Sequence, residues 1–261
     1  MTSDRQRLRQ RLRVLYRYLT HPDGITPLFV LSMPRAGSNM LLDYLRCFPA
    51  IEVRGEVLNP KVTEGIRERG VSTAAVLRHV RRYVYGVKPG AAERCYGTVK
   101  IHLPQLETRG LTVDDLRGAF PAARYIVLFR ESLGEAFVSR LRALRTGQWL
   151  VREGEKRVET TVHVERAELQ AYLDATRASY MALASREWLA PCSVHVGYET
   201  LAREPQRVLD ETICPFLGVA PVPVRTTLQK QNTRALEQVV ENYDEVADLL
   251  VGPSARLGYD A

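Results

Sequence analysis

The sequence lacks several features that would assign it to common classes of protein. It has only four cysteines among 261 residues, with no Cys-x-x-Cys pair, and its histidines show no spacing typical of metal ligands. Neither a disulfide framework nor a zinc site is therefore expected. No apolar run approaches the roughly 20 residues of a membrane span, and the basic N-terminus is not followed by an apolar block. We expect a cytoplasmic protein without a bound metal.

A second absence concerns the phosphate-binding motif of nucleotide triphosphatases, which ends in Gly-Lys-Ser/Thr and holds Mg²⁺ through its hydroxyl. Here the corresponding position reads Gly37-Ser38-Asn39, after an apolar run from Leu28 to Met33. Gly37 permits a tight turn that lets the amides of Ser38 and Asn39 face an oxyanion, and Arg35 adds a fixed positive charge. The segment predicts a strand, a loop that binds phosphate or phosphosulfate without Mg²⁺, and the start of a helix.

The composition is that of one globular α/β domain. With 45% hydrophobic residues the chain can bury a full core. Its formal net charge of +7 and its pI of about 9.4 favour anionic ligands, of which nucleic acid is only one. Residues 1–24 are expected to form a basic amphipathic helix, and residues 25–261 the main domain. We favour a packed leader helix over one that contacts a membrane or an acidic partner. The oligomeric state stays open, a homodimer included.

Apolar strands alternate with helical segments through most of the chain, which predicts a P-loop-like parallel β-sheet flanked by helices, with helical additions. The expected strands are 28–33, 51–54, 96–101, 124–129 and 193–196. The expected helices are 38–47, 61–69, 73–85, 133–145 and 164–187, a short helix capped by 112–115, and mainly helical stretches at 205–218 and 233–250. Three strands end close to Arg35, His102 and Arg130, so polar residues should gather at one edge of the sheet.

Four motifs of this sequence resemble those of the sulfotransferases that use 3′-phosphoadenosine 5′-phosphosulfate (PAPS). They are Pro34-Arg-Ala-Gly-Ser-Asn39, Val99-Lys-Ile-His-Leu-Pro104, Phe129-Arg130 with Ser139, and Val196-Gly-Tyr-Glu-Thr-Leu201. More locally, residues 142–149 resemble the bacterial trehalose 2-sulfotransferase type of carbohydrate sulfotransferase. The resemblance implies a sulfotransferase fold, with PAPS as the sulfate donor and no metal.

The same resemblance implies which residues bind PAPS. The 5′-phosphosulfate would lie against the loop and helix start formed by Arg35, Ala36, Gly37, Ser38, Asn39 and Met40. Arg130 and Ser139 would bind the 3′-phosphate. Lys230 or Gln231 would reach the 3′-phosphate from a C-terminal segment that covers the cofactor, although the same residues also fit the start of a surface helix.

The chemistry of sulfuryl transfer agrees with these residue types. The reaction is mainly an in-line displacement through a loose transition state, so the enzyme must position two oxygens, neutralise the leaving phosphate and accept a proton. Arg35 and the loop amides would stabilise the leaving phosphate, assisted by Lys100. His102, in a Lys-x-His-Leu-Pro pattern, is the favoured base because imidazole titrates near neutral pH. Glu56 stays an alternative base, since carbohydrate-type sulfotransferases resemble this chain in offering a glutamate after the second strand.

We therefore expect an enzyme that transfers sulfate from PAPS to a hydroxyl of a carbohydrate, a glycolipid or another small acceptor. Two alternatives stay open. A divergent P-loop small-molecule kinase would share the loop, but the missing Lys-Ser/Thr ending argues against Mg-ATP. A non-catalytic module that binds anions or nucleic acid would share the positive charge. It is not favoured, and no nucleic-acid partner is expected.

Overall fold

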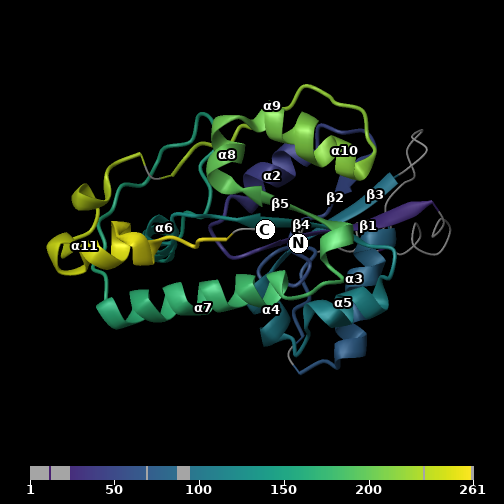
Figure 1. The fold of residues 1–261 in the computed structure, drawn as a ribbon, viewed down its shortest axis with the longest axis horizontal. Coiled ribbons are helices and arrows are strands. Elements are labelled where there is room, and N and C mark those ends of the chain that lie inside the picture. Colours follow the sequence, from purple (N-terminus) through teal and green to yellow (C-terminus); the bar gives the residue numbers. More distant parts are fainter. Residues whose placement is uncertain (1–11, 13–23, 69, 87–94, 232, 260–261) are drawn as a thin grey trace.

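A five-stranded parallel β-sheet lies at the centre of the computed structural model, with the strand order β2-β3-β1-β4-β5 (Figure 1). The structure describes residues 12, 24–68, 70–86, 95–231 and 233–259. The strands are β1 (Ile25–Ser32), β2 (Ile51–Val53), β3 (Cys95–His102), β4 (Arg124–Phe129) and β5 (Ser193–Gly197). The predicted α/β fold with a parallel sheet is confirmed. The helix expected over residues 1–24 lies outside the described residues, apart from residues 12 and 24.

Helices cover both faces of the sheet and pack against it in two apolar layers (Figure 1). One layer contains α2 (Ser38–Leu45), α8 (Tyr198–Arg203), α9 (Pro205–Val208), a π-helical turn η2 (Leu209–Ile213) and α10 (Cys214–Leu217). The other contains α3 (Thr73–Tyr85), α4 (Leu103–Thr108), α5 (Val113–Ala119), α6 (Leu133–Thr146), α7 (Arg166–Ala184) and α11 (Tyr243–Val251). Short 3-10 turns are η1 (Ala190–Cys192), η3 (Leu236–Gln238) and η4 (Pro253–Ala255).

The central strands are apolar on both faces because helices cover both. Strand β3 is buried along its whole length, and successive side chains of β1 alternate between the two layers. Phe29 belongs to the layer of α3 and α7, whereas Leu28 belongs to the layer of α2 and α10. Each such fully buried large side chain stabilises the fold by about 1.5–3 kcal/mol. The continuous apolar runs of the sequence are thus explained by two-sided burial.

The helix predicted over 61–69 is wrong, since residues 61–68 form turns and irregular backbone. Side chains from elsewhere occupy the carbonyl oxygens of this segment. His79 Nε2 lies 2.9 Å from the oxygen of Glu64, and Arg109 donates to the oxygens of Ile66 and Glu68. These tertiary contacts hold the segment in a conformation other than the helix that its local pattern favours.

The stretch 233–250 is mainly helical, as predicted, but in two separate pieces, η3 and all of α11 except its last residue. Between the two pieces the backbone bonds Val162 instead of continuing as a helix. The Val162 amide donates to the oxygen of Val239 at 2.8 Å, and the amide of Glu241 donates to the oxygen of Val162 at 2.9 Å. The helix α4 was not predicted. It begins with His102 as its N-cap, and the His102 amide donates to the side chain of Gln105 at 3.1 Å.

The strand order brings the carboxyl ends of β1, β3 and β4 side by side. Ser32, the last residue of β1, is in register with His102 of β3 on one side and with Leu128 of β4 on the other. The loop before α2 leaves the sheet at the same edge. Open α/β sheets bind their ligands there, so the fold positions the polar strand ends where the sequence analysis expects them.

Candidate active site

The loop between β1 and α2 turns sharply enough to aim the first amides of α2 away from the sheet. Gly37 caps α2 with a φ of 84°, in the left-handed region that favours glycine. A Cβ at this position would lie 2.3 Å from Cδ2 of Tyr198, so no larger residue fits. The first turn of α2 contains no acidic residue. A helix start with free amides and no carboxylate is a favourable place for an anion.

Arg35 makes three hydrogen bonds, all to neutral acceptors. Its Nε donates to Ser139 Oγ at 3.1 Å and its Nη1 to the oxygen of Trp149 at 2.8 Å, while Nη2 donates to Gln231 Oε1. Among the described residues no carboxylate pairs with it. Burial and the neighbouring charge of Arg130 lower the pKa of Arg35 to about 10, which still leaves it charged at neutral pH. A concentrated positive charge therefore lies beside the loop.

Arg130 follows β4 directly and turns toward the same loop. Its Nη1 donates to the backbone oxygen of Arg35 at 3.3 Å, its Nη2 pairs with Glu135, and its guanidinium carbon lies 4.7 Å from the ring centre of Tyr198. Because Ser139 bonds Arg35, the structure brings Arg35, Arg130 and Ser139 together. These are the residues that the sequence analysis assigns to the two anionic ends of one nucleotide.

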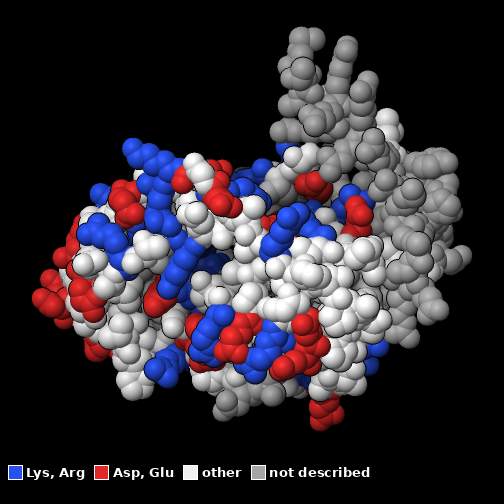
Figure 2. Space-filling view, turned by 90° about the horizontal axis from the view of Figure 1, so that it is seen from above, with Lys and Arg blue, Asp and Glu red and all other residues white. Residues whose placement is uncertain are grey.

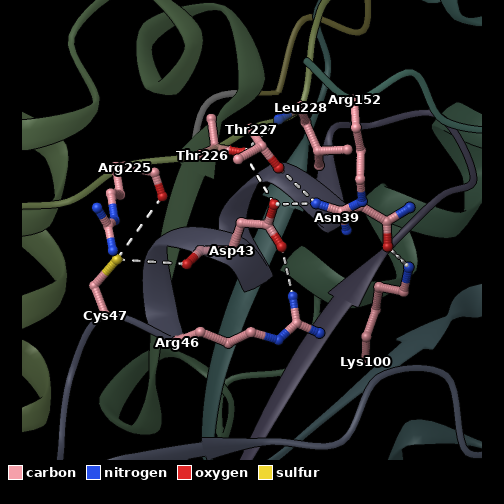
Figure 3. A network of polar contacts seen from close by, with 10 residues as sticks. All are labelled: Asn39, Asp43, Arg46, Cys47, Lys100, Arg152, Arg225, Thr226, Thr227 and Leu228. Carbon is pink, nitrogen blue, oxygen red and sulfur yellow. Dashed lines mark hydrogen bonds and ion pairs between the residues drawn. The ribbon is translucent and has the colours of Figure 1, made fainter. Parts of the chain in front are cut away.

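Glu56 connects the two other basic candidates at this edge. Its Oε1 lies 2.6 Å from Lys100 Nζ and 3.5 Å from His102 Nε2. Lys100 also donates to Asn39 Oδ1 at 2.6 Å, a contact drawn in Figure 3, and this bond ties β3 to the first turn of α2. The other nitrogen of His102, Nδ1, lies 3.1 Å from Ser32 Oγ. The predicted residues Glu56, Lys100 and His102 thus form one contiguous cluster.

Burial and mutual contact set the protonation of this cluster. Burial alone would raise the pKa of Glu56, but its hydrogen bond with His102 and the charge of Lys100 outweigh that effect and hold the pKa well below its usual range. Burial lowers the pKa of Lys100, which is only 1% exposed, against the opposing pull of Glu56. Burial likewise lowers the pKa of His102. At neutral pH the cluster therefore contains a carboxylate and a neutral imidazole.

Two residues that the sequence analysis did not single out hold Glu56 in place. Asn59 Nδ2 donates to Glu56 Oε2 at 2.7 Å, and Gln105 Nε2 donates to the same oxygen at 3.2 Å. The sequence does contain a pattern that marks Gln105: a glutamine three residues after His102 has the spacing of a capping box at the start of α4. No local pattern marks Asn59, which reaches Glu56 through an irregular turn.

Of the two C-terminal residues predicted to contact the donor, Lys230 and Gln231, the structure places only one side chain at the site. Gln231 lies at the site, bonded to Arg35 and, through Nε2, to the oxygen of Gln148 at 2.6 Å. The side chain of Lys230 is exposed, and its backbone oxygen accepts from Arg157 at 3.0 Å. The structure therefore places Gln231, and not the Lys230 side chain, beside Arg35.

Gln231 ends a segment, residues 225–231, that we call the strap because it crosses α2. It pairs with residues 151–153: Glu153 N donates to Thr227 O at 2.7 Å, and Gln229 N to Val151 O at 2.8 Å. Figure 3 shows Asp43 of α2 at the centre of the contact with the strap. Its carboxylate accepts from Arg46 at 2.6 Å, Thr226 at 3.0 Å and Arg152 at 3.4 Å. Asp43 was not predicted from the sequence, because two of its partners, Thr226 and Arg152, are far from it in the chain.

Basic side chains are unevenly distributed over the surface. In Figure 2 a run of Lys and Arg side chains lies left of the centre, while Asp and Glu lie at the left edge and also in the lower centre, where they alternate with further basic side chains. Within the described part of the chain, no group of three or more His, Cys, Asp or Glu could hold a metal ion. No helix in the same residues is long and apolar enough to cross a membrane.

Comparison with known proteins identifies the class. A model of the sulfotransferase family matches residues 27–223, and the chain belongs to this family. It is 28% identical over 248 residues to nodulation protein H of Rhizobium meliloti (strain 1021), covering 88% of this chain and 94% of that protein. It is 27% identical over 229 residues to nodulation protein H of Rhizobium tropici, covering 84% and 87%.

The fold agrees with that assignment. A sulfotransferase from Alicyclobacillus acidocaldarius superimposes with a TM-score of 0.50 at 16% identity, over 80% of this chain and 87% of that one. The protein is therefore a sulfotransferase enzyme, as the motifs predicted. Family membership decides against both alternatives considered above, the small-molecule kinase and the non-catalytic binding module.

Proposed function

We propose that this enzyme transfers the sulfuryl group of PAPS to a hydroxyl of a carbohydrate, glycolipid or small-molecule acceptor. The observation that supports this best is the contact between Arg35 and Arg130, whose guanidinium donates to the Arg35 backbone oxygen at 3.3 Å. Two arginines from different strand ends share one edge of the sheet, with Ser139 bonded to the first. PAPS carries one anionic group on the 5′ side of its ribose and another on the 3′ side. The two arginines could each bind one of these groups.

The residues fit the donor by charge as well as by position. Residues 35–40 present a helix start without acidic side chains and would hold the 5′-phosphosulfate. Arg130 and Ser139 would hold the 3′-phosphate, with Gln231 at its side. Arg35 has only neutral acceptors in the described structure, so a bound dianion would supply the counter-charge that it lacks. No metal is needed for charge neutralisation in this arrangement.

The cluster around Glu56 suggests how the acceptor hydroxyl is activated. His102 would act as the base in the tautomer that carries its proton on Nδ1, which would donate to Ser32 Oγ and leave Nε2 to take the proton of the acceptor in place of its contact with Glu56. The acceptor oxygen then forms a bond to sulfur while the bond from sulfur to the 5′-phosphate oxygen breaks, and the electron pair leaves with the phosphate. Glu56, 3.5 Å from Nε2, stabilises the imidazolium that results. Lys100 and Arg35 neutralise the leaving phosphate.

Glu56 is a weaker candidate for the base in this geometry. Its carboxylate is paired with Lys100 at 2.6 Å and receives bonds from Asn59 and Gln105. These contacts lower its pKa and hence its tendency to accept a proton. We therefore propose His102 as the base and Glu56 as the residue that positions and stabilises it.

A binding experiment and a product assay test the proposed function. Isothermal titration calorimetry should show binding of adenosine 3′,5′-bisphosphate, the product left by PAPS, without added metal. Incubation with PAPS and a panel of sugars, glycolipids and phenols should then give an acceptor with the mass gain of one sulfuryl group. Absence of bisphosphate binding would reject PAPS as the donor, and exclusive transfer to an amine would reject the hydroxyl acceptor.

A further inference from the structure

A small pocket lies beside two of the residues that bond Arg35, Ser139 and Gln231. Its walls include Ser139 and Arg142 of α6, Gln148 and Arg157 of the segment after α6, and Gln231 of the strap. Ser139 and Arg142 are buried, and Arg157 is half-buried. Ser139 and Gln231 both bond Arg35, so the pocket is continuous with the proposed nucleotide site.

The two arginines of this pocket differ in how their charge is compensated. Arg142 pairs with Glu159 at 3.1 Å. Arg157 donates to the backbone oxygen of Lys230 at 3.0 Å and to Thr233 Oγ1 at 3.4 Å, both of them neutral. Its Nε is buried and has no acceptor. Among the residues described, no carboxylate forms an ion pair with Arg157.

A half-buried guanidinium without a counter-charge is unfavourable unless a ligand supplies one. The position of Arg157 indicates the kind of ligand. It lines the same pocket as Ser139, the residue to which the proposed function assigns the 3′-phosphate. A phosphomonoester that reaches Ser139 would therefore also come within reach of Arg157.

We propose that Arg157 binds the 3′-phosphate of the donor and makes the enzyme select nucleotides that carry this group. The inference rests on the proposed function and extends it, because the family motifs assign the 3′-phosphate only to Arg130, Ser139 and the strap. Arg157 lies on the segment that follows α6, outside every motif, and its side chain also bonds the strap at Lys230. Binding of the 3′-phosphate would thus tie these two segments together over the nucleotide.

The test compares two nucleotides in three proteins. Calorimetry with adenosine 3′,5′-bisphosphate and with adenosine 5′-phosphate is carried out on the unaltered enzyme, on Arg157→Gln and on Lys156→Gln. Lys156 is exposed and lies next to Arg157, so its substitution removes the same charge from the same segment. Loss of a charge-assisted phosphate contact should weaken bisphosphate binding by about 10- to 100-fold. Binding of the monophosphate should change little, and Lys156→Gln should match the unaltered enzyme.

Other results would overturn the inference in distinguishable ways. If Arg157→Gln weakens the binding of both nucleotides equally, Arg157 affects binding only through the overall electrostatic field or through the stability of the fold. If it raises the KM of the acceptor and leaves bisphosphate binding unchanged, the pocket holds an anionic group of the acceptor. Failure of the unaltered enzyme to bind the bisphosphate would instead reject the proposed function. Should Arg157→Gln lower the melting temperature, Arg157→Lys keeps the charge and should retain the preference for the bisphosphate in part.

Discussion

The carboxylate of Glu56 lies against the imidazole of His102, with 3.5 Å between Oε1 and Nε2. From the sequence these residues are alternative bases, and in the structure they are partners. Lys100 contacts the same carboxylate oxygen at 2.6 Å. A change at any of the three therefore alters the charge felt by the other two, and their contributions to catalysis should not be additive.

Substitution of His102 by glutamine is expected to lower kcat by about 10²- to 10⁴-fold, because the acceptor hydroxyl loses its general base. Glu56→Gln should lower kcat less, since the base stays and only the stabilisation of its charged form is lost. The double variant should be no slower than His102→Gln alone. Steady-state kinetics with calorimetry of the bisphosphate checks this, and His163→Gln, at an exposed histidine, is the control. Full activity of His102→Gln would transfer the base role to Glu56 or another group.

The pH dependence of kcat should follow from the burial of His102. Burial lowers its pKa below the ordinary value of 6.5, so the imidazole is neutral and active at pH 7. The rate should be constant above neutral pH and decrease only on the acid side, with an apparent pKa below 6.5. Glu56→Gln removes an interaction that raises the pKa of His102, so it should move this decrease to still lower pH. A profile whose midpoint lies above pH 7 would contradict the assignment.

Arg130→Ala should weaken binding of adenosine 3′,5′-bisphosphate by about 10- to 100-fold through loss of a charged phosphate contact. The partly exposed Glu135 pairs with Arg130 and would compete with the phosphate for it. Glu135→Gln should therefore tighten binding, by about 2- to 5-fold for a partly exposed pair. Glu165→Gln makes the same change in net charge at an exposed position and is the control. Weaker binding by Glu135→Gln would show that Glu135 holds Arg130 in its binding position.

Asp43→Asn should weaken donor binding several-fold while kcat at saturating donor changes little. Asp43 holds the strap against α2 through Thr226 and Arg152 (Figure 3), and the strap carries Gln231 to Arg35. Loss of these bonds should also lower the free energy of unfolding by about 1 kcal/mol. Calorimetry and thermal melting separate the two effects, with the exposed Asp248→Asn as control. Reduced stability with unchanged donor affinity would leave Asp43 a purely structural role.

Gly37→Ala should abolish binding of the bisphosphate and destabilise the fold. The φ of 84° is unfavourable for alanine, and the added Cβ would lie 2.3 Å from the ring of Tyr198, against which Arg130 packs. Gly55→Ala is the matched control, because Gly55 has a φ of 81° with nothing within 4 Å of the added atom. It should show only the backbone penalty of about 1–2 kcal/mol. Equal effects of the two substitutions would mean that the Tyr198 ring moves aside for the added Cβ without weakening bisphosphate binding or the fold.

Much of the local structure could be predicted because its causes lie within a few residues. Helix α3 occupies the predicted residues 73–85, since an apolar stripe and a serine N-cap define it. Strand β4 occupies the predicted residues 124–129, since a β-branched and aromatic run between turns defines it. The helix prediction for 61–69 failed because the conformation of 61–68 depends on His79 of α3 and on Arg109, which directly follows α4.

The sequence by itself determined the alternation of strands and helices, the loop at Gly37 and the motifs that identify the family. These depend on side-chain periodicity, on backbone freedom and on spacing along the chain, which are properties of neighbouring residues. Only the tertiary structure decided that Glu56 contacts His102 and that Asp43 holds the strap. It also decided that Arg157 and Ser139 line one pocket. Such contacts join distant parts of the chain, and they follow from the order in which the strands pair and from the packing of helices on each face, which no local pattern contains.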